Sequence, residues 1–377
     1  MRILFASTRG AGHVGPLVPF ARACVAAGHE VRVATAPSAA DHVRRAGLAH
    51  VALDEPDEAI MAPLWDRVRA TPRDEQSPLV LREVFAGEFT RSALPRMLAV
   101  ARGWRPDLVV RESTEYASAL AAGAIGVPSV EVGCFLQGRP PAAFGIEAAL
   151  ARFGLPSAVG AEPYLTLAPR ALEDPRHPEA PGTSRFRAPQ LTPRPLPDWW
   201  QGAREPLVYV SFGSAAAGNG FFPALYRETA DVLAELPIRV LMTVGTEVDP
   251  ADLGPVAPNV HVERWVPQGT VMAHARAMVG HGGSGSTLAA LSAGLPLAVL
   301  PLFADQPENA DRVAALGAGL RVGATAALAD AVSVLLEDPR YRLNARAVAA
   351  EIELLPRVAE AVGVLEELAE VEQLRAA

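Results

Sequence analysis

His281-Gly282-Gly283-Ser284-Gly285-Ser286-Thr287 is a glycine- and hydroxyl-rich stretch between two apolar segments. Residues 277–280 before it predict a buried strand, and residues 288–293 after it predict a helix that ends at Gly294. The glycines permit a tight turn and a close approach of a ligand, and the hydroxyls lie where the first N–H groups of a helix lack partners. Because a helix N-terminus carries partial positive charge, the stretch predicts either a phosphate site or a turn that only caps the helix.

The flanks of this stretch carry a longer pattern. Its parts are Trp265-Val266-Pro267-Gln268 before the stretch and Gly294-Leu295-Pro296, Pro301, Asp305-Gln306 and Asn309 after it. In order and spacing, over about forty-five residues, the pattern resembles the donor-binding signature of the inverting family-1 glycosyltransferases with the GT-B fold. The likeness is greatest to bacterial enzymes that decorate antibiotics and other natural products. A weaker similarity extends over nearly the full length of the chain.

Composition and charge narrow the class of protein. The 377 residues allow two domains, and 50% apolar residues can fill their cores. A net charge of −8 without a basic cluster argues against nucleic acid and acidic membrane surfaces as partners. Cys24 and Cys134 are expected to be buried free thiols. With no secretion signal before the first apolar segment, and with the run 288–304 broken by glycine and prolines, we expect a cytoplasmic protein.

The N-terminal half alternates strand and helix patterns. Residues 3–6 predict a strand, residues 7–15 a glycine loop, residues 16–27 a helix, and residues 31–36 a second strand. A further strand–helix–strand unit is predicted over residues 106–132. This order indicates a parallel sheet with right-handed crossovers.

A second alternation of strands and helices begins at residue 207, after a proline-rich linker predicted at residues 186–206. We therefore expect an α/β protein of the GT-B class, with two facing Rossmann-like parallel-sheet domains and ligands in the cleft between them. The N-terminal, acceptor-binding domain is expected at residues 1–185, and the C-terminal, nucleotide-sugar-binding domain at residues 207–355. The resemblance implies that a last helix, residues 356–377, crosses back to the N-terminal domain.

One glycine-rich segment, Gly10-Ala11-Gly12-His13-Val14-Gly15, matches the dinucleotide-binding pattern G-x-G-x-x-G. A nicotinamide site would need a carboxylate at the end of the second strand, where residues 34–37 have none, so such an enzyme is disfavoured. The resemblance implies instead that His13, in this loop, is the catalytic base. A neutral imidazole can take a hydroxyl proton at cellular pH. A structural histidine is the alternative.

Such a base needs an acid that fixes its tautomer and stabilises its charged form. The resemblance implies an aspartate just after a later strand of the first domain. Here the longer Glu112 stands at that place, after the apolar residues 108–110, and Glu115 is the second choice. The alternative is that Glu112 only pairs with Arg111 or with another charge.

The resemblance also implies donor-binding residues in the second domain. Trp265 would stack on a nucleobase, His281 would donate to a diphosphate oxygen, and Asp305 with Gln306 would bind sugar hydroxyls. A core tryptophan and a loop cap are the alternatives, and residues 211–214 are either a phosphate-contacting loop or a plain turn. The expected set is Ser211, Gly213, Ser214, Trp265, Val266, Gln268, His281, Gly283, Ser284, Gly285, Ser286, Asp305 and Gln306.

Residues 55–100 have a less regular pattern, and the resemblance implies that they help to form the acceptor pocket. The candidate acceptor-binding residues are Met61, Trp65, Phe85, Phe89 and, further along, Phe135. Ordinary core packing is the alternative for each aromatic side chain. No metal site is expected, because residues 249–252 (Asp-Pro-Ala-Asp) are not the D-x-D pair of the other main glycosyltransferase fold. No cofactor is expected beyond the nucleotide sugar itself.

The sequence therefore predicts an inverting sugar transferase that acts on a hydroxyl of a hydrophobic small molecule, as a monomer or homodimer. A nucleotide-sugar 2-epimerase of the same fold is one alternative, and a non-catalytic partner of another transferase is the second. Many UDP-sugar enzymes of the family carry a glutamate two residues after the signature threonine, where this chain has Ala289 after Thr287. That departure favours a dTDP-linked deoxysugar, unless another side chain holds the ribose.

Overall fold

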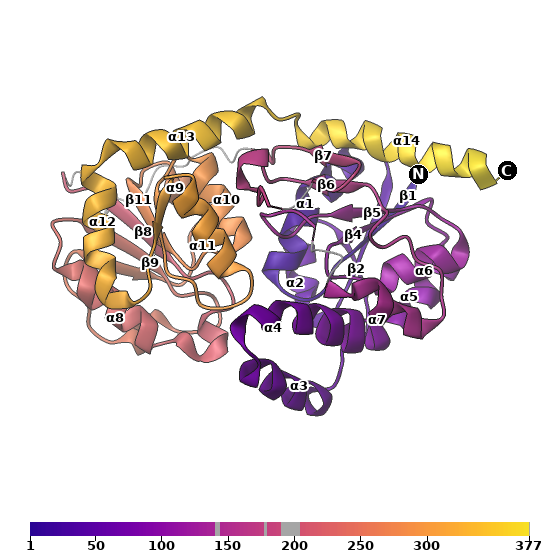
Figure 1. Ribbon diagram of the computed structural model, residues 1–377, viewed down its shortest axis with the longest axis horizontal. Coiled ribbons are helices and arrows are strands. Elements are labelled where there is room, and N and C mark those ends of the chain that lie inside the picture. Colours follow the sequence, from indigo (N-terminus) through magenta and orange to yellow (C-terminus); the bar gives the residue numbers. More distant parts are fainter. Residues whose placement is uncertain (140–143, 177–178, 190–203, 377) are drawn as a thin grey trace. The chain divides into compact units, whose positions relative to one another are not determined.

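The computed structural model describes residues 1–139, 144–176, 179–189 and 204–376. Within it, the chain divides into two compact units (Figure 1). Unit 1 comprises residues 1–168, 174–189 and 356–377, and unit 2 comprises residues 169–173 and 190–355. Most of the predicted linker, residues 190–203, lies outside the described residues.

In the described residues, unit 1 holds a seven-stranded parallel sheet with the strand order β3-β2-β1-β4-β5-β6-β7. The strands are β1 (Arg2–Ala6), β2 (Glu30–Thr35), β3 (Ala49–Ala52), β4 (Leu108–Glu112), β5 (Ser129–Val132), β6 (Tyr164–Thr166) and β7 (Thr183–Arg185). The strand order reverses direction between β1 and β4, which makes the carboxyl ends of these two strands the expected ligand site. Residues 3–6 and 108–110 are fully buried, as expected for uninterrupted apolar strands covered on both faces.

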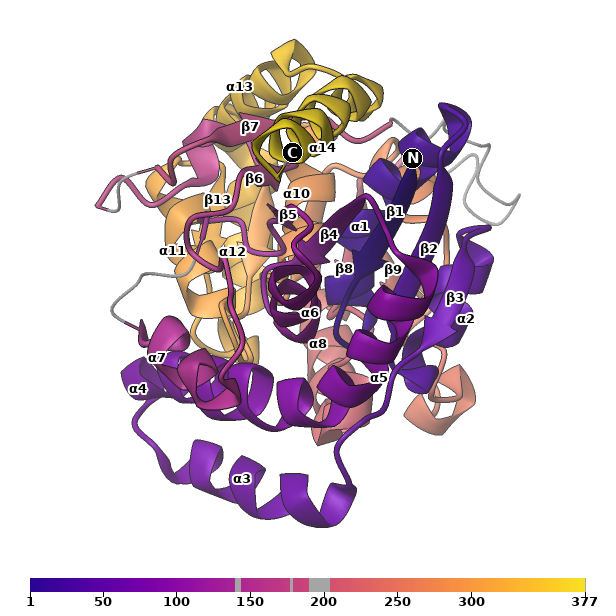
Figure 2. The same ribbon diagram turned by 90° about the vertical axis from the view of Figure 1, so that its right-hand side faces the viewer.

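The helices of unit 1 are α1 (Ala11–Ala26), α2 (Ala40–Arg45), α3 (Glu58–Ala70), α4 (Arg73–Leu79), a π-helix η2 (Val80–Phe89), α5 (Thr90–Trp104), α6 (Ala117–Ile125), α7 (Ile146–Leu150) and α14 (Ala361–Ala376). Residues 55–100, irregular in sequence, are thus mostly helical, and both ribbon views place α3 at the periphery beyond α4 (Figures 1 and 2). The last helix, α14, contributes Val362, Leu365 and Ala369 to the same buried cluster as Leu17 and Phe20 of α1.

The loop predicted over residues 7–15 is wrong in its second half, because α1 begins at Ala11. Gly10 precedes the helix with a φ of 104°, a conformation that glycine adopts without strain. Gly12 and Gly15 lie inside the helix, where a glycine costs about 1 kcal/mol relative to alanine but does not prevent helix formation. His13 consequently lies in the first helical turn rather than in a loop.

Unit 2 holds a six-stranded parallel sheet, again counted in the described residues, with the order β10-β9-β8-β11-β12-β13. Its strands are β8 (Leu207–Ser211), β9 (Arg239–Thr243), β10 (Val260–Glu263), β11 (Ala277–Gly280), β12 (Leu297–Val299) and β13 (Gly319–Arg321). Its α-helices are α8 (Ala224–Ala234), α9 (Gln268–Met272), α10 (Ser284–Ser292), α11 (Gln306–Ala315), α12 (Leu328–Glu337) and α13 (Pro339–Leu354).

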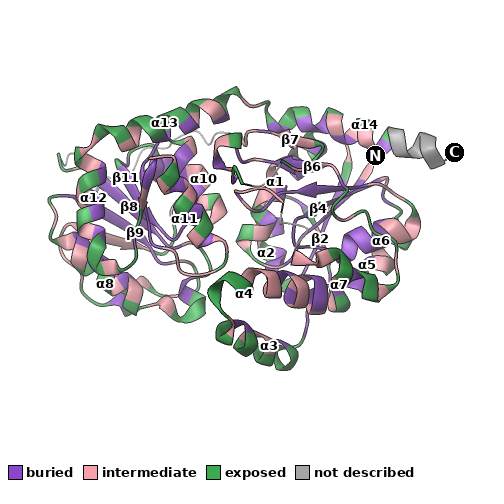
Figure 3. Cartoon of the chain, in the orientation of Figure 1, coloured by how far each residue is buried: buried purple, intermediate pink, exposed green. Residues whose placement is uncertain are grey.

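Burial follows the layers of each unit (Figure 3): central strands such as β4, β8 and β11 are buried, whereas edge strands such as β3 and β7 are partly exposed, and most helices expose one face. Cys24 and Cys134 are both buried and neither forms a disulfide with the other, as predicted. Across the part of the chain that the structure describes, no helix combines the length and the apolar character that a membrane span requires.

Candidate active site

His13 lies at the carboxyl end of the unit 1 sheet, beside the last residue of β4. Its Nδ1 atom is 3.4 Å from Oε1 of Glu112 and 3.1 Å from Oγ1 of Thr114. The parallel pairing of β1 with β4 brings these residues together. Ala6 is opposite Arg111, so the segments that follow the two strands begin at the same edge of the sheet. The His13 side chain is 27% exposed, whereas that of Glu112 is fully buried.

Two threonines surround the Glu112 carboxylate with donors. Thr8 donates its N–H (3.1 Å) and its hydroxyl (2.7 Å), and Thr114 donates its N–H and its hydroxyl, each at 2.7 Å. Burial by itself raises the pKa of Glu112, but the charge of His13 and the hydrogen bonds from His13 and Thr114 lower it to about 2. Glu112 is therefore ionised at neutral pH.

An ionised carboxylate can only accept hydrogen bonds, so the geometry assigns the proton of neutral His13 to Nδ1. The Thr114 hydroxyl already donates to Glu112, so its oxygen can accept from the same N–H. Nε2 is then the basic nitrogen of His13. This is the arrangement that a general base needs, with an acid holding the tautomer and stabilising the imidazolium.

Glu115, the second choice from the sequence, has different partners. Its carboxylate accepts from the N–H of Ser118 at 3.0 Å and from the Ser118 hydroxyl at the start of α6. Burial raises the pKa of Glu115 to about 7, and the Ser118 hydrogen bonds only partly oppose that effect. The acid beside His13 is thus Glu112.

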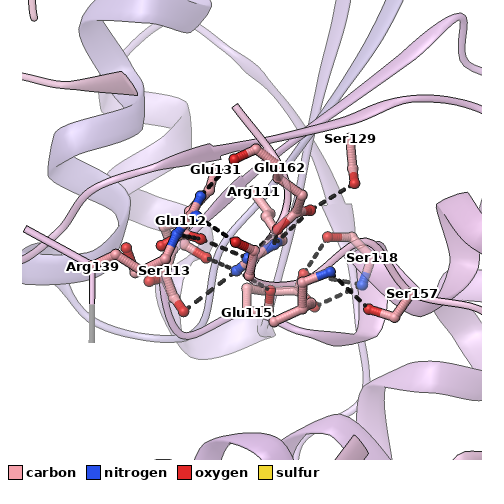
Figure 4. Close-up of polar contacts among 12 residues, drawn as sticks. Arg111, Glu112, Ser113, Glu115, Ser118, Ser129, Glu131, Arg139, Ser157 and Glu162 are labelled. Carbon is pink, nitrogen blue, oxygen red and sulfur yellow. Dashed lines mark hydrogen bonds and ion pairs between the residues drawn. The ribbon is translucent and has the colours of Figure 1, made fainter. Parts of the chain in front are cut away.

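The alternative that the Glu112 carboxylate pairs with Arg111 is wrong, because Arg111 bonds to Glu112 only at its main-chain oxygen. The Arg111 guanidinium instead bonds to Glu131 and Glu162 on the other side of β4 (Figure 4). Sequence reasoning missed these partners, and it also missed Thr8 and Thr114. The two threonines had a detectable signal, since each is a polar residue just past the end of a central strand.

A pocket in unit 1 adjoins the His13–Glu112 pair. Its lining includes Thr114, Glu115 and the predicted acceptor-binding residues Phe85 and Phe89. The Phe85 ring lies 5.4 Å from the imidazole of His13, centroid to centroid. The pocket therefore lies beside the candidate base.

The other predicted acceptor-binding residues do not line that pocket. Met61 is buried in a small cluster with Val84 and Phe89, and Trp65 packs against the same cluster. Phe135 is partly buried beyond β5. For Met61 in particular, core packing accounts for its position.

One group of side chains has the composition of a metal site. Ligand atoms of His13, Glu112 and Cys134 all lie within 4.8 Å of one another. The donors from Thr8 and Thr114 already occupy the Glu112 oxygens, so a cation would have to displace them. The sequence did not suggest this grouping, because the three residues lie on separate segments.

In unit 2, the glycine- and hydroxyl-rich stretch 281–287 follows β11 and includes the first turn of α10. The predicted helix start at Leu288 is wrong, since α10 begins at Ser284 and the turn is only His281-Gly282-Gly283. A Cβ atom on Gly283 would lie 2.3 Å from the His281 ring, and one on Gly213 would lie 2.7 Å from it. The ring is therefore held between two glycine backbones that no larger residue could replace without displacing it.

Burial lowers the pKa of His281 to about 4, and a hydrogen bond with the Ser211 backbone opposes this shift only in part. Because His281 is neutral at pH 7, its ring has a single N–H, and the hydrogen bond to the Ser211 backbone uses it, so the neutral ring has no N–H left for an anion. The β8–β11 pairing places Gly280 opposite Ser211, so the loops after both strands meet at this edge.

Polar residues after β12 contact the start of α10. Asp305 accepts from the Ser284 hydroxyl and from the Asn309 amide, each at 2.9 Å. The Gln306 side-chain oxygen accepts from the N–H groups of Leu302 (2.8 Å) and Phe303 (3.0 Å). The side-chain oxygen of Gln306 thus caps the loop 302–303, as the loop-cap alternative expects. Asp305, just before α11, connects the start of that helix to the start of α10.

Among the remaining donor candidates, Gln268 contacts the same helix end. Gln268 donates to the Ser286 hydroxyl at 3.4 Å, which ties the segment after β10 to α10. Trp265 is 63% exposed, so it is not a core tryptophan, and its ring is open to stacking. Gly285 and Ser214 are exposed, and Val266 is partly buried.

Comparisons with known proteins agree with this architecture. Residues 22–137 and 227–368 match the N-terminal and C-terminal domains described as erythromycin biosynthesis protein CIII-like. An L-demethylnoviosyl transferase of Streptomyces niveus is 34% identical over 328 residues, which cover 85% of this chain and 84% of that relative. The solved structure of the glycosyltransferase SnogD from Streptomyces nogalater has 30% sequence identity and a TM-score of 0.78, covering 98% of this chain and 99% of SnogD.

A second solved structure is that of SsfS6, a glycosyltransferase of Streptomyces sp. SF2575 complexed with thymidine diphosphate. It has 27% sequence identity and a TM-score of 0.78, and the match covers 97% of this chain and 99% of SsfS6. Two parallel-sheet, Rossmann-like units with these neighbours constitute the GT-B fold. The chain therefore belongs to the family-1 natural-product glycosyltransferases of the erythromycin biosynthesis protein CIII-like group.

Proposed function

We propose that the protein transfers a deoxysugar from a dTDP-sugar to a hydroxyl of a hydrophobic natural product, with inversion at the anomeric carbon and with His13 as the general base. The observation that carries this proposal is the contact of His13 Nδ1 with the ionised, fully buried Glu112, next to a pocket lined by Phe85 and Phe89. It supports a base whose Nε2 takes the proton of an acceptor bound in unit 1.

The proposed reaction is one displacement. The acceptor hydroxyl transfers its proton to Nε2 of His13 while its oxygen forms a bond to the anomeric carbon. The bond from that carbon to the diphosphate breaks on the opposite face, and the diphosphate leaves with the electron pair. Glu112 stays ionised and stabilises the imidazolium, and N–H and hydroxyl groups at the start of α10 offset the charge of the leaving group.

Turnover by the purified chain tests this proposal directly. We expect a panel of hydrophobic acceptors and dTDP-sugars to yield glycosylated products detectable by mass spectrometry. A donor incubated alone should be unchanged, because a 2-epimerase would form the epimer without an acceptor. Activity that requires a second protein would favour the partner-protein alternative instead.

The proposal of a dTDP donor rests on Ala289 and is supported by the thymidine diphosphate bound to SsfS6. Ala289 follows Ser286 by three residues, so both lie on the same face of α10, where Gln268 donates to Ser286. A carboxylate at this place would gain charge-assisted bonds from two ribose hydroxyls. Facing a deoxyribose, it would lose one partner, and a buried unpaired charge is costly.

We therefore expect the wild-type protein to bind dTDP more tightly than UDP, and the Ala289→Glu variant to shift toward UDP. Calorimetric titration with both nucleotides measures the two affinities. Leu288→Glu is the matched control, since it adds the same charge about 100° further around the helix and should not change the preference. Equal or tighter binding of UDP by the wild-type protein contradicts the dTDP assignment.

A chelator tests whether the reaction needs a divalent metal ion. We expect full activity without added divalent cations and little loss in EDTA, because the donors at the start of α10 suffice for the diphosphate charge and no D-x-D pair is present. Initial rates with EDTA, with Mg²⁺ and with neither provide the measurement. Complete inhibition by EDTA that Mg²⁺ or Mn²⁺ reverses would overturn this expectation.

A further inference from the structure

A buried ion cluster lies under the turn that carries Glu112 (Figure 4). The side chains of Arg111 and Glu162 are fully buried, those of Glu131 and Arg139 are 2% and 14% exposed, and their formal charges cancel. Arg111 on β4 is the paired neighbour of Glu131 on β5, so the two side chains share one face of the sheet. Glu112, the next residue along β4, projects to the opposite face.

The Arg111 guanidinium uses all three of its nitrogens as donors. Nε donates to Glu162 at 3.0 Å, and Nη2 donates to Glu131 at 2.8 Å and to Glu162. Nη1 donates to the main-chain oxygens of Glu112, Ser113 and Glu115 at 3.2, 3.3 and 3.4 Å. One side of the guanidinium is thus anchored in the ion cluster, and the other contacts three carbonyls of the turn 112–115.

That turn holds Glu112 and Thr114, whose side chains contact Nδ1 of His13. The N–H of Glu115 donates to the Glu112 carbonyl at 3.1 Å and closes the turn. Within it, the N–H and hydroxyl of Thr114 bond to the Glu112 carboxylate, and the same hydroxyl contacts Nδ1 of His13. A shift of the turn would therefore move Glu112 and Thr114 together relative to the imidazole.

Stability alone does not account for this arrangement. Burying two cations and two anions costs desolvation free energy, and well-packed apolar side chains often serve stability as well or better. Burial by itself lowers the pKa of Arg111, but Glu162 and Glu131 raise it above its usual range, so the guanidinium stays charged. What an apolar side chain cannot supply is a rigid fork of donors aimed at three carbonyls.

We propose that Arg111 is a positioning residue for sugar transfer, which fixes the turn 112–115 and thereby aligns Glu112 and Thr114 with His13. The inference rests on the proposed function, because it acts through His13 as the base. It adds a residue that touches neither substrate nor His13.

The first test is Arg111→Lys, which keeps the charge but loses the planar fork. We expect kcat to fall by roughly tenfold or more, since small misplacements of catalytic groups cost factors of this size. The affinity for dTDP should be unchanged, because the donor residues lie in unit 2.

The matched control is Arg139→Lys. Arg139 bonds to the same Glu131 carboxylate and to the carbonyls of Gly160 and Glu162, but to none of the turn carbonyls. Its kcat should remain within about twofold of wild type.

The decisive measurement is a double-mutant cycle with His13→Ala. If Arg111 acts by positioning the partners of His13, adding Arg111→Lys to His13→Ala lowers kcat by less than about twofold further. A purely structural residue would lower kcat by the same factor in both backgrounds, and that outcome overturns the inference. High activity of His13→Ala alone would instead overturn the proposed base, so the two failures are distinguishable.

A milder variant covers the case that Arg111→Lys does not fold, as judged by circular dichroism. Glu131→Gln leaves Nη2 held by Glu162 and weakens the anchor without removing the guanidinium. We expect a smaller loss of kcat that again disappears in the His13→Ala background. An unchanged kcat in a folded Glu131→Gln protein, together with equal effects of Arg111→Lys and Arg139→Lys where both fold, would contradict the positioning role.

Discussion

Replacing His13 with alanine is expected to lower turnover by about 10²-fold or more, the contribution of a well-placed general base. Nδ1 faces the ionised Glu112, so the variant loses both the basic nitrogen Nε2 and the imidazolium that Glu112 stabilises. Steady-state kinetics with saturating donor and acceptor provide the measurement. Calorimetry with dTDP should give an unchanged affinity, because the proposed donor-binding residues belong to unit 2.

His50→Ala is the control for the loss of an imidazole elsewhere in unit 1. The His50 ring contacts the carbonyl oxygen of Thr35 at 3.1 Å and does not line the pocket. The His50→Ala variant should retain turnover within about twofold of wild type. Near wild-type turnover in His13→Ala would contradict the role of His13 as the base.

Replacing Glu112 with alanine is expected to cost turnover less than His13→Ala and more than Glu115→Ala. Without Glu112, the imidazole can still accept a proton, but its tautomer is no longer fixed and the imidazolium loses its partner. The loss should be roughly tenfold or more, a part of what a general base contributes. Glu115→Ala instead removes a carboxylate that bonds to Ser118, so its effect should be chiefly on stability.

Two measurements separate turnover from stability in this series. The N–H groups of Thr8 and Thr114 lose their acceptor in Glu112→Ala, at a cost of about 1–3 kcal/mol for each group that stays buried and unsatisfied. Urea unfolding quantifies that loss, and kcat is then compared under conditions where every variant is folded. If Glu115→Ala reduces kcat more than Glu112→Ala does, the orienting acid has to be reassigned to Glu115.

Much of the fold was predictable because several central strands contain uninterrupted apolar runs. Residues 3–6, 108–110 and 277–280 lie in strands β1, β4 and β11. Since ligands bind at the carboxyl ends of parallel strands, this pattern also predicts that His13 and Glu112 lie at one edge of a sheet. The helix starts were predicted too late, because glycines and serines that favour loops occupy the first turns of α1 and α10.

The surroundings of His13 and Glu112 could not be predicted in the same way. Arg111 reaches Glu162, which is 51 residues away, only because β4, β5 and β6 pair in one particular register. Near the pocket, the π-helix η2 interrupts the spacing of 3.6 residues per turn on which helix-face arguments depend. Aromatic residues on either side of it could therefore be identified, but not sorted into pocket and core.

The division of the chain has a consequence for recombining this enzyme with its relatives. Residues 356–377 follow unit 2 in sequence but belong to unit 1, where Val362, Leu365 and Ala369 join the core around α1. A chimera that exchanges everything after residue 190 would therefore pair a foreign last helix with the native α1. One that exchanges only residues 190–355 keeps the unit 1 core from a single parent. If the donor and the acceptor bind to separate units as proposed, splicing at both points is the route by which the two preferences are inherited separately.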